Sequence, residues 1–458
     1  MSNPSAFPPV RRREIFGWAM FDFANSSYTT LIITVAFSVY FTKVVAAGPE
    51  ADWWWGVGIA VSNLLVMVTS PIVGAVADDS GRKKLFLFAS YVLCVVGTAA
   101  LFFAQPGQVT FALALLVVSN VAFSFGENFA GAFLPEISTP RNIGRVSAFG
   151  WSIGYFGGLL CLLLARPLLS GLHWPRQQLL APENAGVYLD LRLAWVLTAG
   201  FFLLAAIPTF VLLRERAPRG PRRSLMGYAS AGFSRLATTV REARHFSELV
   251  RFLVVFFLYQ AGLTTVVAFA SIFAERTLSF TADELIGLFL MLQLSSAGGA
   301  MGFGWLQDRF GGRSTIRVTL VLWVIVCVGS YFCYSKAVFW ALALTAGLGI
   351  GSLQSASRAL VGLFSPPEKS GEFFGLWGLA GKGAYFFGPL VFGLISSASG
   401  SQRVAILSTA LFFIAGLVGM QWIDERRGHR EAEAWHAARI AAAEAPEEDD
   451  ARLDAPQA

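Results

Sequence analysis

The sequence carries little charge for its length. Asp, Glu, Lys and Arg make up 14% of its 458 residues, whereas a typical soluble domain has about 25%. So few charged side chains could not cover a surface that faces water on all sides, which argues against a soluble enzyme. A nucleic-acid-binding protein is also disfavoured, because the net charge of +6 comes from cations at the ends of apolar segments, not from one basic patch.

Cysteine and histidine are equally scarce. The four cysteines lie singly in apolar runs, without a Cys-x-x-Cys pair, so neither a disulfide nor a zinc framework is expected. The four histidines lie in predicted loops or in the tail, and the sequence has neither a His-Glu-x-x-His pair nor a phosphate-binding loop. We therefore expect no metal, no cofactor, no ATP-driven motor and no enzymatic activity.

Apolar residues are abundant instead, at 55% of the chain. That is enough for twelve membrane spans of about 21 residues each, and twelve apolar runs occur between residues 15 and 423. The first run follows Arg11–Arg13 as in a signal peptide, but it is too long, contains Asp22 and lacks a cleavage site. The predicted fold is an all-α membrane protein with twelve transmembrane helices, the first of them uncleaved.

The cations predict the orientation. Most of the 35 Lys and Arg fall in alternate connections, beginning with the N-terminal segment and ending with the tail. Because cations near helix ends resist translocation, both termini are expected in the cytoplasm, in an inner or plasma membrane. The expected partners are the lipid bilayer and a small-molecule substrate but no nucleic acid, and we expect a monomer.

Two features divide the chain into halves. A long connection rich in Arg, Pro and Gly separates six predicted helices from six, and GAVADDSGRKK (74–84) recurs as GWLQDRFGGRS (304–314) half a chain later. Such self-similarity is typical of two pseudo-symmetric six-helix halves around a central site. The predicted organisation is an N-terminal segment 1–14, a first half 15–213, a basic linker 214–248, a second half 249–423 and a tail 424–458 with a short helix around Trp435.

The repeated segment is similar to the loop motif of the major facilitator superfamily, roughly G-x-x-x-D-R-x-G-R-[RK]. The resemblance implies a gating role for its residues, with Asp78 capping the helix that follows. The first copy has Asp79 where the family has Arg, so the family's inter-helix ion pair cannot be carried over there, whereas the second copy keeps Asp308 and Arg309. The residues of the two copies are Gly74, Asp78, Asp79, Gly81, Arg82 and Lys83, and Gly304, Asp308, Arg309, Gly311 and Arg313.

A narrower resemblance comes from GWAMFDFANSSYTT (17–30), LPEI (134–137), SRAL (357–360) and EFFGLWGLAGKGAYFFGP (372–389). These strings are similar to the branch called the unknown major facilitator family, which includes the autophagy-related vacuolar amino-acid effluxers of fungi. One departure is that the family's Tyr-Asn-Asp-Gly in helix 7 is Tyr259-Gln260-Ala261-Gly262 here. A coupling role of that Asp therefore cannot be assigned to Ala261.

Four charged residues lie inside predicted spans. Asp22 and Glu127 are in the first half, and Arg358 and Lys382 are in the second. Buried charges are costly in a membrane and usually face the interior of the bundle. They could bind substrate and a proton, or Asp22, Glu127 and Arg358 could only form a gate that closes the cytoplasmic side.

Further residues complete the predicted site. Asp22, Asn25, Ser26 and Thr29 share one face of the first helix, and the resemblance implies that helices 1, 4, 7 and 10 line a cavity. The candidate substrate-binding or coupling residues are Asp22, Asn25, Tyr28, Glu127, Asn128, Trp151, Tyr155, Tyr259, Gln260, Gln354, Arg358, Trp377 and Lys382.

The resulting hypothesis is a secondary transporter that works by alternating access, coupled to an ion, with a proton the first candidate. The resemblance implies a small polar organic substrate, with amino acids first, and favours export. The alternatives are a drug or lipid efflux transporter, or a non-transporting membrane receptor or scaffold that docks partners on its basic linker and tail.

Overall fold

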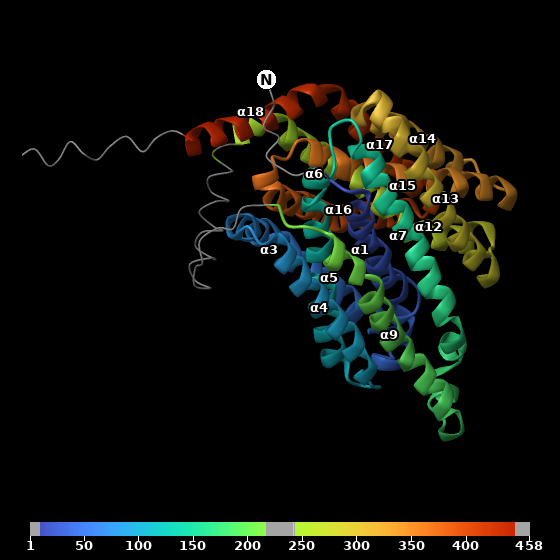
Figure 1. Ribbon diagram of the computed structural model, residues 1–458. Coiled ribbons are helices and arrows are strands. Elements are labelled where there is room, and N and C mark those ends of the chain that lie inside the picture. Colours follow the sequence, from blue (N-terminus) through green and yellow to red (C-terminus); the bar gives the residue numbers. More distant parts are fainter. Residues whose placement is uncertain (1–9, 217–240, 242, 445–458) are drawn as a thin grey trace, which may run out of the picture.

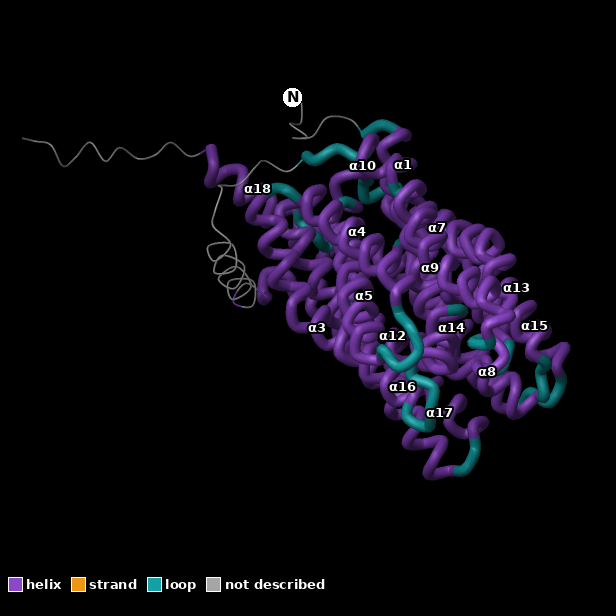
Figure 2. The backbone as a smooth tube through the Cα atoms, turned by 90° about the horizontal axis from the view of Figure 1, so that it is seen from below, coloured by secondary structure: helices purple, strands orange, loops and turns teal. Residues whose placement is uncertain are grey.

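A computed structural model describes residues 10–216, 241 and 243–444. Within these residues every regular element is helical (Figure 2). Twelve helical segments are long and apolar enough to cross a membrane. The predicted all-α fold with twelve spans is therefore confirmed.

The first half contains six spans. The first of them is irregular, because α1 (Arg12–Tyr28) continues as π-helical turns at Thr29–Val35 and Phe41–Val45 that flank α2 (Phe37–Tyr40). The other helices are α3 (Ala51–Ser80), α4 (Lys83–Ala100), α5 (Val109–Ala132), α6 (Leu134–Ile137), α7 (Ile143–Ala165), α8 (Arg176–Leu179), α9 (Ala185–Ala205) and α10 (Ile207–Leu212).

The second half repeats the plan and ends in a tail helix. Its spans are α12 (Ser247–Leu278), α13 (Ala282–Phe310), α14 (Gly312–Tyr331), α15 (Lys336–Leu363), α16 (Ser370–Ser399) and α17 (Gln402–Gly419), followed by α18 (Glu425–Glu444). Most of the predicted linker 214–248, and the tail after residue 444, lie outside the described residues.

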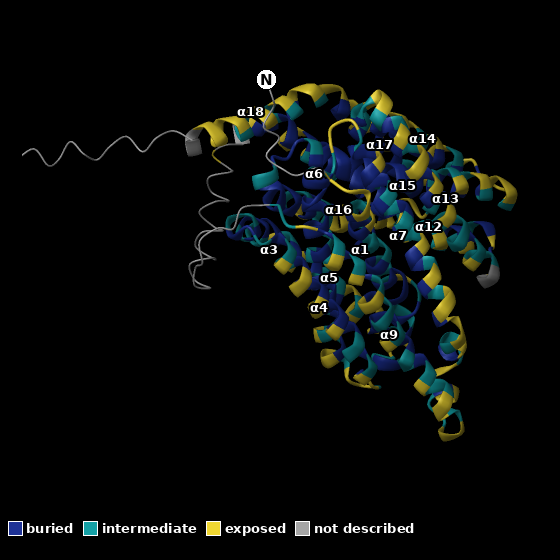
Figure 3. Ribbon diagram, in the orientation of Figure 1, coloured by how far each residue is buried: buried dark blue, intermediate teal, exposed yellow. Residues whose placement is uncertain are grey.

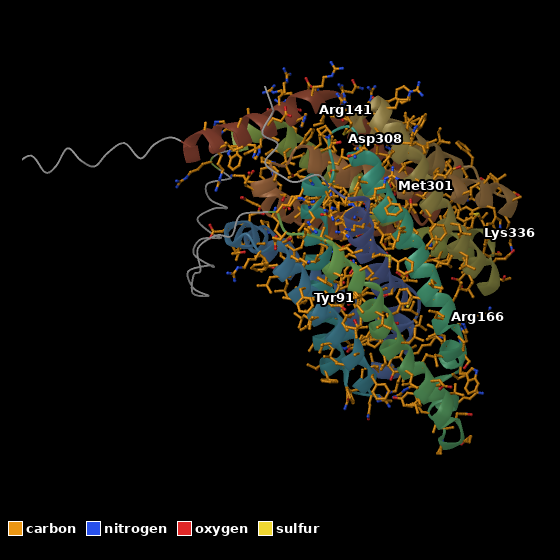
Figure 4. The ribbon with its side chains drawn as sticks, viewed as in Figure 1. Tyr91, Arg141, Arg166, Met301, Asp308 and Lys336 are labelled. Atoms are coloured by element: carbon orange, nitrogen blue, oxygen red, sulfur yellow. The ribbon has the colours of Figure 1, made fainter. Side chains whose placement is uncertain are left out.

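The two ends of the bundle differ. We call the end that carries both repeated loops, around residues 78–83 and 308–313, the motif end, and the opposite end the distal end. The beginning of α1 and the tail helix α18 both lie at the motif end (Figure 1). In Figure 4, Arg141 and Asp308 lie near the motif end, and Arg166 and Lys336 lie toward the distal ends of the two halves.

A glycine with a positive φ angle closes each repeated loop. Gly81 has φ 58° and ends α3, and Gly311 has φ 89° between α13 and α14. Both backbones are in a region that side chains disfavour, which explains a glycine at each position.

The halves meet mainly through two helix crossings, α3 against α16 and α7 against α13. A Cβ at Gly74 would overlap the backbone of Gly371, and a Cβ at Gly304 would overlap Ala148, so glycine permits both close approaches. The outer faces carry exposed apolar side chains such as Leu64, Val68 and Leu394, as a lipid-facing surface requires (Figure 3).

Candidate functional site

A cavity of about 350 Å³ lies between the halves, within the range of small-molecule sites. Eleven of the thirteen predicted site residues line it: Asp22, Asn25, Glu127, Asn128, Trp151, Tyr155, Gln260, Gln354, Arg358, Trp377 and Lys382. Ser26 and Thr29, the other members of the polar face of α1, line it too. Much of the wall comes from the first, fourth, seventh and tenth spans, which are α1, α5, α12 and α15. These are the four spans that the resemblance implies.

Tyr28 and Tyr259 are placed elsewhere. Tyr28 is fully buried, stacks on Phe123 and bonds the hydroxyl of Ser119 at 2.8 Å within the first half. Tyr259 bonds the hydroxyl of Ser357 at 2.7 Å inside the core of the second half. Both side chains point away from the cavity, so the structure does not support their inclusion in the site.

The cavity wall includes three polar residues that had not been predicted. Asn63, Asn120 and Thr264 add polar groups, and Tyr385 adds a ring beside Lys382. Asn120 could have been found from the sequence, because it precedes Glu127 by two helical turns and so shares its face.

Asp22 and Arg358 form an ion pair between the halves. Arg358 Nη1 lies 2.7 Å from Asp22 Oδ2, and the two side chains are only 4% and 14% exposed. The guanidinium also donates to the carbonyl oxygen of Ser147 at 2.8 Å and lies over the rings of Trp18 and Trp151. This buried pair ties α1, α7 and α15 together on the motif side of the cavity.

Gly150 makes room for that pair. A Cβ built on Gly150 would overlap the carboxylate of Asp22 and crowd the guanidinium of Arg358. The glycine on α7 therefore lets charges from both halves meet against its helix.

Glu127 and Lys382 carry the other two charges and are arranged differently. Both line the cavity, yet neither forms an ion pair within 4.0 Å in the described part of the chain. Lys382 lies 5.5 Å from the ring of Tyr385. A carboxylate from one half and an ammonium from the other are thus held apart in the same cavity.

Several polar atoms of the lining residues lack partners. Among the described residues, Asn25 Oδ1, Gln260 Oε1 and the indole N–H groups of Trp151 and Trp377 are buried without a hydrogen bond. A buried polar atom left unpaired costs about 1–3 kcal/mol. The cavity therefore favours water or a ligand that can both donate and accept hydrogen bonds.

At the motif end, Asp78 caps a helix of the opposite half. Its carboxylate accepts hydrogen bonds from the backbone N–H groups of Gly371 and Glu372, at 3.0 and 2.8 Å, where α16 begins. The prediction that Asp78 caps the following helix, α4, is wrong, because the crossing at Gly74 brings the start of α16 closer. The carboxylate complements the positive end of the α16 dipole.

Lys83, in the first repeated loop, is buried. Its ammonium lies 2.8 Å from Glu136 and 3.4 Å from Asp78. It also donates to the carbonyl oxygen of Pro367 and the hydroxyl of Ser370, both at 2.6 Å, on the other half. Arg82 and Asp79 beside it are half-buried.

Asp308 repeats the arrangement of Asp78 with the halves exchanged. It accepts from the backbone N–H groups of Gly144 and Arg145, at 2.9 and 3.3 Å, where α7 begins. Its ion-pair partner is Arg145, not the neighbouring Arg309, which lies over Trp305 and Phe310. Arg313 instead bonds the end of the second half, through the carbonyls of Met420 and Gln421.

We expect Asp308→Asn to slow transport while leaving substrate affinity within a few-fold of wild type. The carboxylate at a helix N-terminus stabilises the closed motif end by about 1–2 kcal/mol, and Asn removes its charge but not its shape. Transport rate and equilibrium binding measured on the same preparation test this expectation. Glu284→Gln, the same change at the distal end of α13, is the control, and a folded Asp308→Asn protein that cannot bind substrate would contradict it.

The tail helix α18 packs on the motif end of the second half. The helix expected around Trp435 is thus present, and Trp435 lies between Phe246 and the ammonium of Lys369. The backbone N–H groups of Arg427 and Arg426 hold the pKa of Asp424 below its usual range, as a cap at the start of α18. The tail helix α18 is therefore part of the fold of the second half.

Known proteins are similar to this chain in both sequence and fold. A family profile described as "Vacuole effluxer Atg22 like" matches residues 57–433. The uncharacterized MFS-type transporter YxiO of Bacillus subtilis is 26% identical over 417 residues, which cover 89% of this chain and 94% of that protein. Autophagy-related protein 22 of Kluyveromyces lactis is 24% identical over 418 residues, which cover 83% of this chain and 81% of that one.

Solved structures agree on the architecture. The human organic anion transporter MFSD10 has a TM-score of 0.72 at 16% identity, over 90% of this chain and all of that one. The E. coli fucose:proton symporter FucP has a TM-score of 0.68 at 16% identity, over 90% of this chain and 98% of that one. These relatives and neighbours are transporters, and the chain has their twelve-helix membrane fold. It is a multi-pass membrane transporter that belongs to the Atg22-like vacuole effluxer family of the major facilitator superfamily.

Proposed function

We propose that this transporter moves amino acids by alternating access and that a proton gradient drives it. The observation that carries the proposal is the separated pair of charges, Glu127 from the first half and Lys382 from the second. An amino acid is a zwitterion, so its ammonium would pair with Glu127 and its carboxylate with Lys382. Substrate would then bridge the two halves, whose movement about the site transports it.

The Asp22–Arg358 pair has a different proposed role. Its charges neutralise each other at 2.7 Å across the halves, so we assign it to the gate on the motif side and not to substrate. Both repeated loops close the same side. The proposal thus divides the four intramembrane charges into a gating pair and a substrate pair.

Proton coupling would follow because Glu127 binds both a proton and the ammonium of the substrate. One carboxylate cannot hold a proton and pair with an ammonium at the same time, so the two ligands would compete for it. Competition of this kind makes an antiporter, and an inward proton gradient would drive export. The proposed setting is an inner or plasma membrane, with a monomer whose motif end faces the cytoplasm.

Lys382→Ala should weaken binding of an amino acid by about 10- to 100-fold and leave binding of the corresponding amino-acid amide nearly unchanged. A hydrogen bond to a charged group contributes about 1.5–3 kcal/mol. The amino-acid amide has no carboxylate that could pair with Lys382, so the variant removes no such bond from it. Titration calorimetry with both ligands, on the wild type and the variant, measures the difference. Equal losses for both ligands would contradict a contact between Lys382 and the carboxylate.

Glu127→Gln should abolish accumulation driven by a pH gradient while leaving slow exchange of substrate that does not depend on pH. Gln keeps the size of the side chain but cannot take up a proton. Uptake into proteoliposomes with and without a pH gradient tests this, with Asp22→Asn as the comparison. Full gradient-driven transport by both variants would show that neither acid carries the proton.

A further inference from the structure

Six carboxamides line the cavity: Asn63 and Asn128, and four more that come one from each of four helices. Asn25 lies on α1, Asn120 on α5, Gln260 on α12 and Gln354 on α15, and all four line the cavity. They come from the first and the fourth span of each half. Asn25 and Gln260 are equally far from the first residues of α1 and α12, and Asn120 and Gln354 lie on the fourth span of each half.

These four residues, which we call the carboxamide belt, lie at one depth. At 1.5 Å per residue they are about 14–20 Å from the motif-end termini of their helices, and Lys382 is at about 18 Å on α16. By the same measure Glu127 is about 8 Å from the motif-end terminus of α5 and so lies nearer the motif end, which means that the belt surrounds the Lys382 side of the ligand position. The apolar lining residues Ile33 and Val267 lie about two turns farther toward the distal end.

The hydrogen-bonding capacity of the belt is largely unused. In the described part of the chain its side chains make one hydrogen bond, from Asn120 Nδ2 to Ser62 Oγ at 3.0 Å. Asn25 and Gln260 are only 4% and 3% exposed, and each has a buried carboxamide oxygen without a partner. A hydrocarbon side chain placed here would leave these groups unpaired.

We propose that the carboxamide belt selects amino acids with an uncharged hydrogen-bonding side chain, such as an amide or a hydroxyl, over hydrocarbon side chains of the same shape. The inference rests on the proposed function, because it assigns the side-chain position of the same site. A carboxamide both donates and accepts, so it can pair with either half of an amide group or with a hydroxyl. A site that hydrogen-bonds a polar group of its ligand strongly rejects an analogue without that group. An apolar site rejects an analogue with an added polar group much less strongly.

Two pairs of natural amino acids of nearly equal shape test the proposal. Asparagine resembles leucine with an amide in place of the branched methyls, and threonine resembles valine with one hydroxyl. We expect the purified protein to bind asparagine at least about tenfold more tightly than leucine, and threonine more tightly than valine. Gln354→Met and, separately, Gln260→Met should reduce the asparagine-to-leucine ratio to within about threefold, whereas Thr345→Val, on α15 outside the cavity, should keep the wild-type ratio.

The outcomes separate the two proposals. Leucine bound as tightly as asparagine would overturn the inference and leave amino-acid transport standing. Equal losses for asparagine and leucine in a folded Gln354→Met or Gln260→Met protein would also overturn it, because the belt would then be structural. Failure of all four amino acids to bind would overturn the proposed function itself.

Discussion

Arg358→Ala should open the motif end and reduce transport by at least about 100-fold. The guanidinium is 4% exposed and is the ion-pair partner of Asp22 at 2.7 Å. Removing one member of a buried pair costs about 3–5 kcal/mol, because the other charge stays buried without compensation. That cost falls on the conformation in which the halves are closed at this side, so the opposite conformation gains population.

A reporter cysteine makes the shift measurable. Ser355 is 1% exposed and its carbonyl accepts from Ser147 of the other half, so Ser355→Cys should react slowly with a water-soluble maleimide in the otherwise wild-type protein. The four native cysteines are buried and give a low background. Arg358→Ala should raise the rate of labelling strongly, and Asp22→Asn combined with Arg358→Gln should restore most of the protection because no buried charge is left over. An unchanged rate in Arg358→Ala would contradict the gating role of the pair.

Lys83→Met should destabilise the protein by about 3–5 kcal/mol, the second large effect that we expect. The ammonium is fully buried and neutralises Glu136 at 2.8 Å, and it makes two further bonds to the other half. Methionine fills most of the volume but leaves Glu136 as a buried carboxylate without its cation. The loss of stability is measured as a decrease in the melting temperature of the purified protein in detergent.

Two comparison variants sharpen this expectation. Arg82→Met changes the neighbouring, half-buried cation and should lower the melting temperature only slightly. Lys83→Met combined with Glu136→Gln removes both charges and should recover much of the stability lost in the single variant. A single variant as stable as the wild type would show that Lys83 is not an anchor of the closed motif end.

The number of spans and the two-fold repeat could be predicted from the sequence because both follow from the membrane. Apolar runs of spanning length are forced by the bilayer, and the two loop motifs repeat at half the chain. The irregular first span could not be predicted, since nothing in residues 29–45 distinguishes π-helical turns from an α-helix. The partner of Asp78 was also missed, because a helix start in the other half is far away in the sequence.

Charge and helical spacing together predicted which side chains line the cavity. Asp22, Asn25, Ser26 and Thr29 share one face and all line the cavity. Tyr259 lies outside the cavity because it is about 100° around the helix from Gln260, which turns its hydroxyl toward Ser357 within its own half. A residue on a cavity-lining helix therefore lines the cavity only if it also lies on the face of the helix that is turned toward it.

Transport by the purified protein in proteoliposomes tests the central claim most directly. With an imposed pH gradient, we predict saturable transport of radiolabelled amino acid, and we predict that it is lost in Lys382→Ala and is no longer driven by the gradient in Glu127→Gln. Vesicles without protein give the background. Amino-acid transport no faster than in empty vesicles, from wild-type protein that is folded and correctly inserted, would contradict the account.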